Sequence, residues 1–124
     1  MPIRSVLAVL LSTAALAGPA FAAGDPANGE KVFRRCMACH VADAATNRLG
    51  PHLGDVYGRQ VGTVEGFNYS QGLVGAGFVW DEVTLDPWLA DPKAVIPGTR
   101  MVLKLSKPED RADVIAYLKR LSGQ

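Results

Sequence analysis

Apolar positions near the C-terminus recur at the three- and four-residue spacing of an amphipathic helix, in the segment SKPEDRADVIAYLKRLSG (106–123). The apolar stripe comprises Val114, Ile115, Leu118 and Leu121, with Tyr117 at its edge. Acidic residues fill the first turn and basic residues the last, which complements the helix dipole. The pattern predicts a helix that starts at Pro108, with Ser106 or Lys107 as its N-cap.

A second helix is predicted in the segment DPANGEKVFRRCMACH, residues 25–40. Asp25 is a favourable N-cap, and Pro26 suits the first helical position because a missing N–H costs nothing there. One face of this helix comprises Gly29, Val32, Phe33 and Cys36. We expect the helix to run from Pro26 to Cys36 or Ala38.

The remainder of the chain favours turns over long elements. A short helix is predicted with Thr84 as N-cap and Pro87 in its first turn, ending at Asp91–Pro92. Residues 41–79 contain many glycines that predict turns, with room for one short helix at LGDVYG, residues 53–58. Because so long a loop is unusual in a compact domain, either the predicted fold is wrong or the loop wraps a large ligand.

The first 23 residues have the features of a cleaved secretory signal peptide. Arg4 precedes an apolar run from Val6 to Leu16, and the segment ends in the small-x-small pattern AFA. The run is shorter than the roughly 20 apolar residues needed to span a bilayer. We therefore expect residues 1–23 to be removed. Residues 24–124 should form one domain, exported to the periplasm and soluble, without stable membrane insertion.

Charge and size narrow the range of functions. The chain of 124 residues carries 13 Lys and Arg against 12 Asp and Glu, and loss of Arg4 with the leader makes the mature domain formally neutral. A neutral domain argues against a nucleic-acid partner, which requires clustered basic residues. A domain of about 100 residues buries only a limited core, so an additional group is expected to complete it.

The only two cysteines, Cys36 and Cys39, lie three positions apart and are followed at once by His40. A disulfide or a redox dithiol would use such a pair, but a dithiol motif lies beside strands that this sequence does not predict. Zinc requires four ligands, and His52 would complete the number without a familiar spacing. Cys-x-x-Cys-His is instead the pattern of c-type haem attachment. The two thiols would add to the porphyrin vinyl groups, and the histidine would bind iron.

The ligand on the other face of the iron distinguishes two kinds of haem protein. An open face would allow gas or peroxide chemistry, whereas a filled face restricts the protein to electron transfer. Met1 is lost with the leader, and Met37 lies inside the attachment motif. Met101, in the segment IPGTRM, is the candidate ligand, although a lone methionine is more often part of a core. His52 is the rival ligand.

Several motifs in the same order resemble class I cytochrome c, the soluble mitochondrial and alpha-proteobacterial type. These motifs are CMACH, GPHLGDVYGRQVGTVEGFNYS, FVWDEVTL, DPKAVIPGTRM and RADVIAYLKRL, and the resemblance spans residues 24–122. It implies an all-α fold in which the N- and C-terminal helices cross. Gly29 and Phe33 would pack there against Val114 and Tyr117, and loops and short helices would wrap one covalently bound haem c.

The resemblance also implies roles for individual residues. Cys36 and Cys39 would form the thioethers, and His40 and Met101 would be the axial ligands. Pro51 would accept a hydrogen bond from the other ring nitrogen of His40. The remaining cofactor-binding residues would be Arg59, Tyr69 and Trp80 at the propionates, Thr99 in the methionine loop and Trp88 beside the ligand sulfur. Gly50, Gly54 and Gly58 are assigned only to turns or core.

The chain departs from the family pattern at four positions. Trp88 stands where the family usually has tyrosine, and Leu73 replaces a residue that is often polar. Pro87 removes a donor from its helix, and His52 is not the usual neighbour of the proline before it. These departures affect the expected reduction potential more than the expected iron ligation.

The function implied is that of a monomeric one-electron carrier rather than an enzyme. It would shuttle electrons from a quinol-oxidising cytochrome bc complex or a dehydrogenase to a terminal oxidase or a photosynthetic centre. The alternative is a haem protein with an open or labile sixth site, peroxidase-like or gas-binding. Contact with redox partners would be transient and steered by charge. The basic residues around the haem edge would be Arg35, Arg48, Lys93, Arg100 and Lys107.

Overall fold

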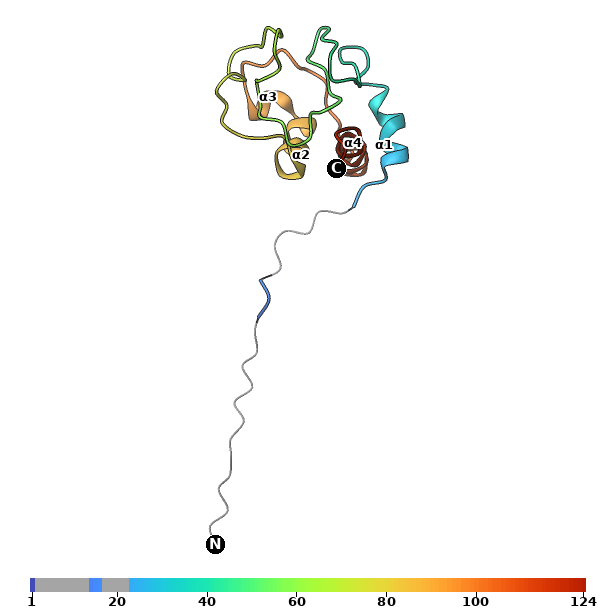
Figure 1. Ribbon diagram of the computed structural model, residues 1–124, viewed down its shortest axis with the longest axis vertical. Coiled ribbons are helices and arrows are strands. Elements are labelled where there is room, and N and C mark those ends of the chain that lie inside the picture. The colour runs from blue at the N-terminus through green and yellow to red at the C-terminus, as the bar shows by residue number, and fades with distance from the viewer. Residues whose placement is uncertain (2–13, 17–22) are drawn as a thin grey trace.

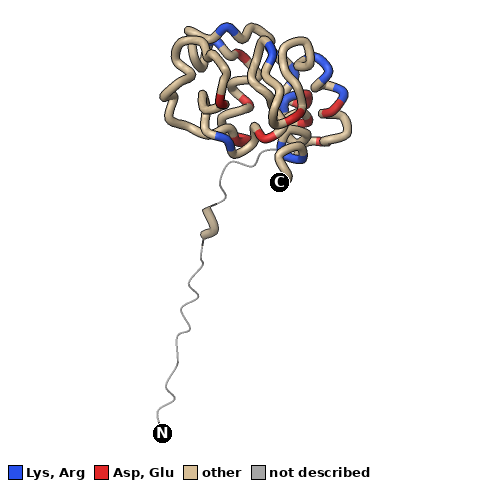
Figure 2. Tube along the Cα trace, turned by 45° about the horizontal axis from the view of Figure 1, so that its top comes forward, with Lys and Arg blue, Asp and Glu red and all other residues tan. Residues whose placement is uncertain are grey.

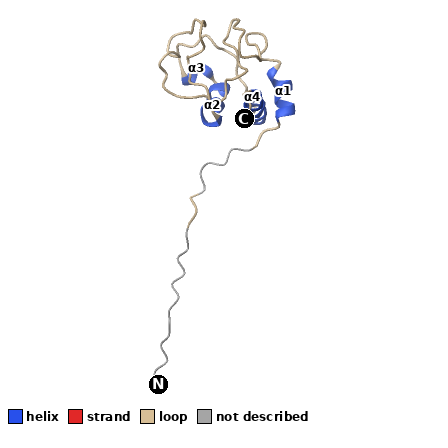
Figure 3. Cartoon of the chain, viewed as in Figure 1, coloured by secondary structure: helices blue, strands red, loops and turns tan. Residues whose placement is uncertain are grey.

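The fold consists of four helices joined by long loops. The computed structural model describes residues 1, 14–16 and 23–124 (Figure 1). The helices are α1 (Pro26–Phe33), α2 (Glu82–Ala90), α3 (Pro92–Val95) and α4 (Pro108–Leu121). The described residues contain no strand, only an isolated antiparallel bridge between Gln60 and Val79 (Figure 3). The all-α prediction is confirmed, whereas the predicted signal peptide lies largely outside the described residues and stays a prediction.

Helices α1 and α4 lie against each other, as predicted (Figure 1). At Gly29 the two backbones approach so closely that an added Cβ would overlap the Asp113 carbonyl and lie 2.9 Å from the Tyr117 Cβ. One turn further along α1, the rings of Phe33 and Tyr117 pack with their centroids 5.2 Å apart. Helix propensity alone would favour alanine at position 29. The close contact with α4 therefore explains why this position is glycine.

The start of α1 is bound to α4 by polar groups. The Asp25 side chain caps α1 by accepting from the Ala27 N–H at 2.9 Å. The Asp113 carboxylate of α4 accepts from the Asp25 N–H at 2.8 Å and from Asn28 Nδ2 at 2.7 Å. Because one carboxylate of α4 binds both the N-cap residue and the first turn of α1, the start of α1 is fixed against α4.

The predicted extension of α1 to Cys36 or Ala38 was wrong. The helix ends at Phe33, and the chain continues in tight turns in which the Cys36 N–H donates to the Phe33 carbonyl at 2.8 Å. The His40 N–H then donates to the Cys36 carbonyl at 3.0 Å. Hydrophobic spacing does not separate such turns from an α-helix, because side chains three residues apart share a face in both.

Helix α2 begins three residues earlier than predicted. Its N-cap is Asp81, whose carboxylate accepts from the Thr84 N–H at 2.9 Å while Thr84 Oγ1 accepts from the Asp81 N–H at 2.9 Å. This reciprocal capping box places Thr84 inside the helix and Pro87 in its interior. Asp91 then ends α2 and precedes α3, a short helix that the sequence did not predict.

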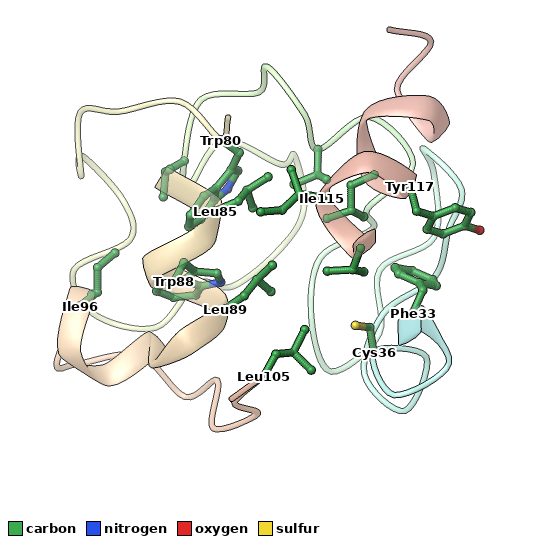
Figure 4. Close-up of a cluster of buried hydrophobic side chains, with 14 of the residues drawn as sticks. Phe33, Cys36, Trp80, Leu85, Trp88, Leu89, Ile96, Leu105, Ile115 and Tyr117 are labelled. Atoms are coloured by element: carbon green, nitrogen blue, oxygen red, sulfur yellow. The ribbon is translucent and has the colours of Figure 1, made fainter. Parts of the chain in front are cut away.

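The long segment between α1 and α2 forms turns, and the predicted helix at 53–58 is absent from it. Backbone bonds join the middle of this segment to its end: the Val61 N–H donates to the Phe78 carbonyl at 2.9 Å, and the Trp80 N–H to the Arg59 carbonyl at 2.9 Å. Figure 4 shows the core that results, with side chains from all parts of the domain. Helix α4 begins at Pro108 as predicted, and its buried residues are Val114, Ile115, Tyr117 and Leu118.

Replacing Gly29 by alanine tests the close helix contact. Helix propensity alone predicts that Gly29→Ala stabilises the protein by up to about 1 kcal/mol. Steric overlap with α4 predicts the opposite sign, a loss of about 2–3 kcal/mol in the free energy of unfolding. Denaturant unfolding of both proteins measures the difference, with Lys31→Ala on the exposed side of α1 as the control. An unchanged or increased stability of Gly29→Ala would show that the helices do not touch there.

Candidate functional site

The turn after α1 presents two free cysteines in different environments. Cys36 is buried, with 9% of its surface exposed, and Figure 4 shows its sulfur directed toward the core. Burial raises the pKa of the Cys36 thiol to about 11, against a smaller opposing effect of Arg35. Cys39 is exposed. Neither cysteine forms a disulfide in this structure, so both sulfur atoms remain available for thioether bonds.

His40 is held by a hydrogen bond that leaves one ring nitrogen free. Its Nδ1 lies 2.6 Å from the Pro51 carbonyl oxygen, which can only accept, so Nδ1 carries the proton and Nε2 keeps its lone pair. Burial lowers the pKa of His40, which favours the neutral ring that a metal requires. The hydrogen bond to Pro51 opposes this shift in pKa but fixes the orientation of the ring.

Gly50 leaves the space that the His40 ring occupies, a role that the sequence did not predict. Its N–H donates to the Cys39 carbonyl at 2.8 Å. A Cβ at this position would overlap the His40 imidazole and lie 2.6 Å from its Nδ1. The ring therefore packs on the bare glycine backbone. The sequence offered no signal beyond a glycine before a proline, which equally indicates an ordinary turn.

The segment that carries Met101 is fixed by a buried threonine. Thr99 is 3% exposed, and its Oγ1 accepts from the Met101 N–H at 3.2 Å. The Thr99 carbonyl accepts from Lys93 Nζ at 2.9 Å, which joins the segment to α3. Met101 itself is partly buried and packs against the core. The structure thus places Met101 on a restrained loop that borders the same core as Cys36.

The aromatic residues expected at the cofactor lie in or beside the same core. Trp80 and Trp88 are each 6% exposed, and their rings pack with centroids 5.1 Å apart (Figure 4). The Tyr69 hydroxyl accepts from the Val64 N–H at 2.9 Å and keeps its own hydrogen to donate. These rings supply N–H and O–H donors within an apolar environment.

Arg59 and His52 belong to a separate polar cluster. Arg59 Nη1 donates to the His52 carbonyl at 3.0 Å and to Asp55 Oδ1 at 2.7 Å. The structure therefore binds part of this guanidinium to its own loop. His52 does not join the cysteines and His40 in a zinc site, because residues 1, 14–16 and 23–124 contain no group of three metal-binding side chains placed to hold an ion.

The donor set fits a covalently bound haem. Two free thiols lie three residues apart, one directed into the core, and His40 offers a single unprotonated nitrogen. Gly50 provides a cradle for the ring of His40 that any side chain would fill. The core that contains Cys36 also includes Trp80 and Trp88, and Tyr69 and Met101 pack against it. Apolar side chains, a thioether and aromatic donors are the mixture of contacts that a porphyrin with two carboxylates requires.

Comparisons with known proteins identify the family. The sequence profile of the family Cytochrome c matches residues 26–122. The chain is 50% identical to cytochrome c2 of Rhodomicrobium vannielii over 107 residues, which cover 85% of this chain and 86% of that protein. It is 45% identical to cytochrome c-554 of Methylosinus trichosporium over 119 residues, covering 94% and 90% of the two chains.

A solved structure agrees with these sequences. Cytochrome cH from Methylobacterium extorquens superposes with a TM-score of 0.73 at 44% identity, covering 78% of this chain and 99% of that one. The chain belongs to the cytochrome c family. Its cofactor is covalently bound haem c, and its class of function is electron transport, as the resemblance implied. In the part of the chain that is described, each helix is too short or too polar to cross a membrane.

The contact between Gly50 and His40 gives a test of the site. Gly50→Ala should displace the imidazole and lower the yield of protein with correctly bound haem several-fold, because the added methyl group occupies the position of the ring. The ratio of haem absorbance to polypeptide after periplasmic expression measures this yield. Leu49→Ala is the matched control, since Leu49 is 79% exposed. A normal yield and spectrum for Gly50→Ala would contradict the packing described.

Proposed function

We propose that this protein is a soluble periplasmic carrier of single electrons, with haem bound at Cys36 and Cys39 and iron bound by His40 and Met101. The observation that carries the proposal is the 2.6 Å hydrogen bond from His40 Nδ1 to the Pro51 carbonyl, which leaves Nε2 as the only basic ring nitrogen. The restraint of Met101 through Thr99 supports a ligand of fixed position. With both His40 and Met101 bound to iron, no position would remain for a substrate, which would favour electron transfer.

The protein groups adapt the site to rapid electron transfer. When bound, haem iron would accept and release one electron by changing between its ferric and ferrous states. The soft sulfur of Met101 favours the ferrous state, and the apolar core disfavours the additional positive charge of the ferric state. Pro51 and Gly50 hold the ring of His40, while Thr99 and Lys93 hold the loop of Met101. Fixed ligands keep the rearrangement between oxidation states small.

The exposed basic residues support contact with acidic partners. Arg48 and Arg100 line one pocket of about 410 Å³, together with Leu49 and Phe67. Lys93 is linked to the same loop as Arg100 through the Thr99 carbonyl. Figure 2 shows several Lys and Arg segments along the upper edge of the domain, while others lie at the right and lower edges among Asp and Glu segments. The basic residues of the upper edge would steer partners of the cytochrome bc, oxidase or photosynthetic type toward that edge.

Removing the proposed sulfur ligand tests the assignment of Met101. Met101→Ala should abolish the weak far-red absorption band that reports sulfur bound to ferric iron, and should lower the reduction potential because the ferrous state loses its preferred ligand. Spectra of oxidised and reduced protein and a potentiometric titration measure both effects. Met37→Ala is the matched control, because Met37 lies in the attachment motif and is 52% exposed.

The same spectra separate the carrier from the alternative function. Persistence of the far-red band in Met101→Ala would exclude Met101 as the ligand. Rapid binding of carbon monoxide to the reduced unmodified protein would indicate an open sixth site and a gas-binding or peroxidase-like function. A normal band, together with slow carbon monoxide binding, supports the carrier.

Charge steering predicts a dependence of turnover on salt. Electron transfer to or from a purified cytochrome bc complex or oxidase should slow as ionic strength rises through about 0.1 M, where charges more than roughly 10 Å apart are screened. Arg48→Gln and Lys107→Gln should lower the association rate several-fold at low salt and flatten the salt dependence. Lys31→Gln, an exposed charge of α1 outside the proposed set, serves as the control. Salt-independent turnover would contradict the proposed contact.

A further inference from the structure

An ion pair closes the base of the methionine loop, residues 91–104. Lys104 Nζ lies 2.9 Å from Asp91 Oδ2. Asp91 ends α2, and Lys104 is the third residue after Met101. The pair therefore joins the two ends of the loop that carries the proposed iron ligand.

The loop is restrained unequally on the two sides of Met101. On the side before it, the Met101 N–H donates to Thr99 Oγ1 at 3.2 Å, and the Arg100 N–H donates to Ser70 Oγ at 3.1 Å. On the side after it, residues 102–103 form no hydrogen bond with any residue that the structure describes. The position of Met101 on this side therefore depends on where the chain is next fixed.

The chain is next fixed at residues 104 and 105. The Leu105 N–H donates to the Leu89 carbonyl at 2.8 Å, and the Leu105 side chain is completely buried. The ion pair of Lys104 lies one residue nearer to Met101 than this backbone bond. Its loss would lengthen the stretch of unrestrained chain that follows Met101.

The Asp91 carboxylate depends on Lys104 for its counter-ion. Asp91 Oδ1 is buried without a hydrogen-bond partner, so the contact of Lys104 with Oδ2 is the one that compensates the charge. The hydrogen bond from Lys104 lowers the pKa of Asp91, which keeps the carboxylate charged near neutral pH. A charged group that loses its partner gains by moving toward water, and here such a movement would shift the base of the loop.

We propose that Asp91 and Lys104 are positioning residues for Met101, and that their ion pair sets how readily an external ligand displaces Met101 from iron. The proposal rests on the proposed function, in which Met101 is the sixth ligand. In the displacement, imidazole binds iron through a ring nitrogen while the bond to sulfur breaks. No electron is transferred, and the oxidation state of iron does not change.

The exposure of the pair determines the size of the expected effect. The side chain of Lys104 is 56% exposed and that of Asp91 is 38% exposed. Exposed pairs of this kind shift an equilibrium by a small factor, so loss of the pair should tighten the binding of an external ligand by about two- to fivefold.

Titration of the ferric holoprotein with imidazole tests the proposal, with loss of the far-red band as the measure of displacement. Lys104→Met and Asp91→Asn should each bind imidazole about two- to fivefold more tightly than the unmodified protein. Lys104→Arg should bind it as the unmodified protein does, because it keeps the charge. Lys119→Met is the matched control, since it makes the same substitution in an exposed pair with Glu82 that joins α4 to α2.

Two further measurements distinguish positioning from a general loss of stability. Raising the ionic strength to about 1 M shortens the screening length to about 3 Å. Uncharged imidazole should then bind the unmodified protein and Lys119→Met more tightly, but Lys104→Met unchanged. The denaturant midpoint of Lys104→Met should fall no further than that of Lys119→Met, because the pair fixes one loop.

Two results would overturn the proposal. One is an unchanged affinity for imidazole in Lys104→Met, and the other is an equal increase in Lys119→Met. The spectrum of the unmodified protein separates this failure from failure of the proposed function. A normal far-red band with equal imidazole affinities would contradict only the role of the ion pair, whereas absence of the band would contradict ligation by Met101 itself.

Discussion

The close approach of α1 and α4 is the constraint on which the site depends. Gly29 allows the helices to touch, and the Asp113 carboxylate fixes the start of α1 against α4. Because only a few residues separate Gly29 from Cys36, this contact determines where the attachment turn begins. The turn directs Cys36 into the core and presents Cys39 and His40 beyond it. A structural contact between the first and last helices thereby positions the residues proposed to carry the chemistry.

Individual hydrogen bonds, rather than regular secondary structure, fix the loops in the rest of the domain. Loops make up residues 34–81, and single hydrogen bonds accepted by Pro51, Tyr69 and Thr99 fix the segments around the core. A small domain of this kind gains little from regular secondary structure. Covalently bound haem supplies apolar surface around which such loops can pack.

The elements with strong local signals were predictable, and those defined by contacts were not. Pro108, acidic residues and a clear apolar stripe located α4 correctly. The end of α1 and the start of α2 were misplaced by a few residues. Tight turns continue the same hydrophobic spacing after Phe33, and Asp81 competes with Thr84 for the cap. Helix α3 was missed because Asp91–Pro92 both ends one helix and begins another.

The sequence by itself determined the cofactor, the family and the candidate ligands, because Cys36, Cys39 and His40 form a contiguous motif whose spacing is local. Only the tertiary structure showed that Gly50 also holds His40 in place. Gly50 contacts His40 across a loop, and the Asp113 carboxylate of α4 accepts from the Asp25 N–H at the start of α1, a contact that no spacing revealed. Attachment chemistry depends on neighbours along the chain, whereas the orientation and charge of a side chain depend on neighbours that folding brings from elsewhere.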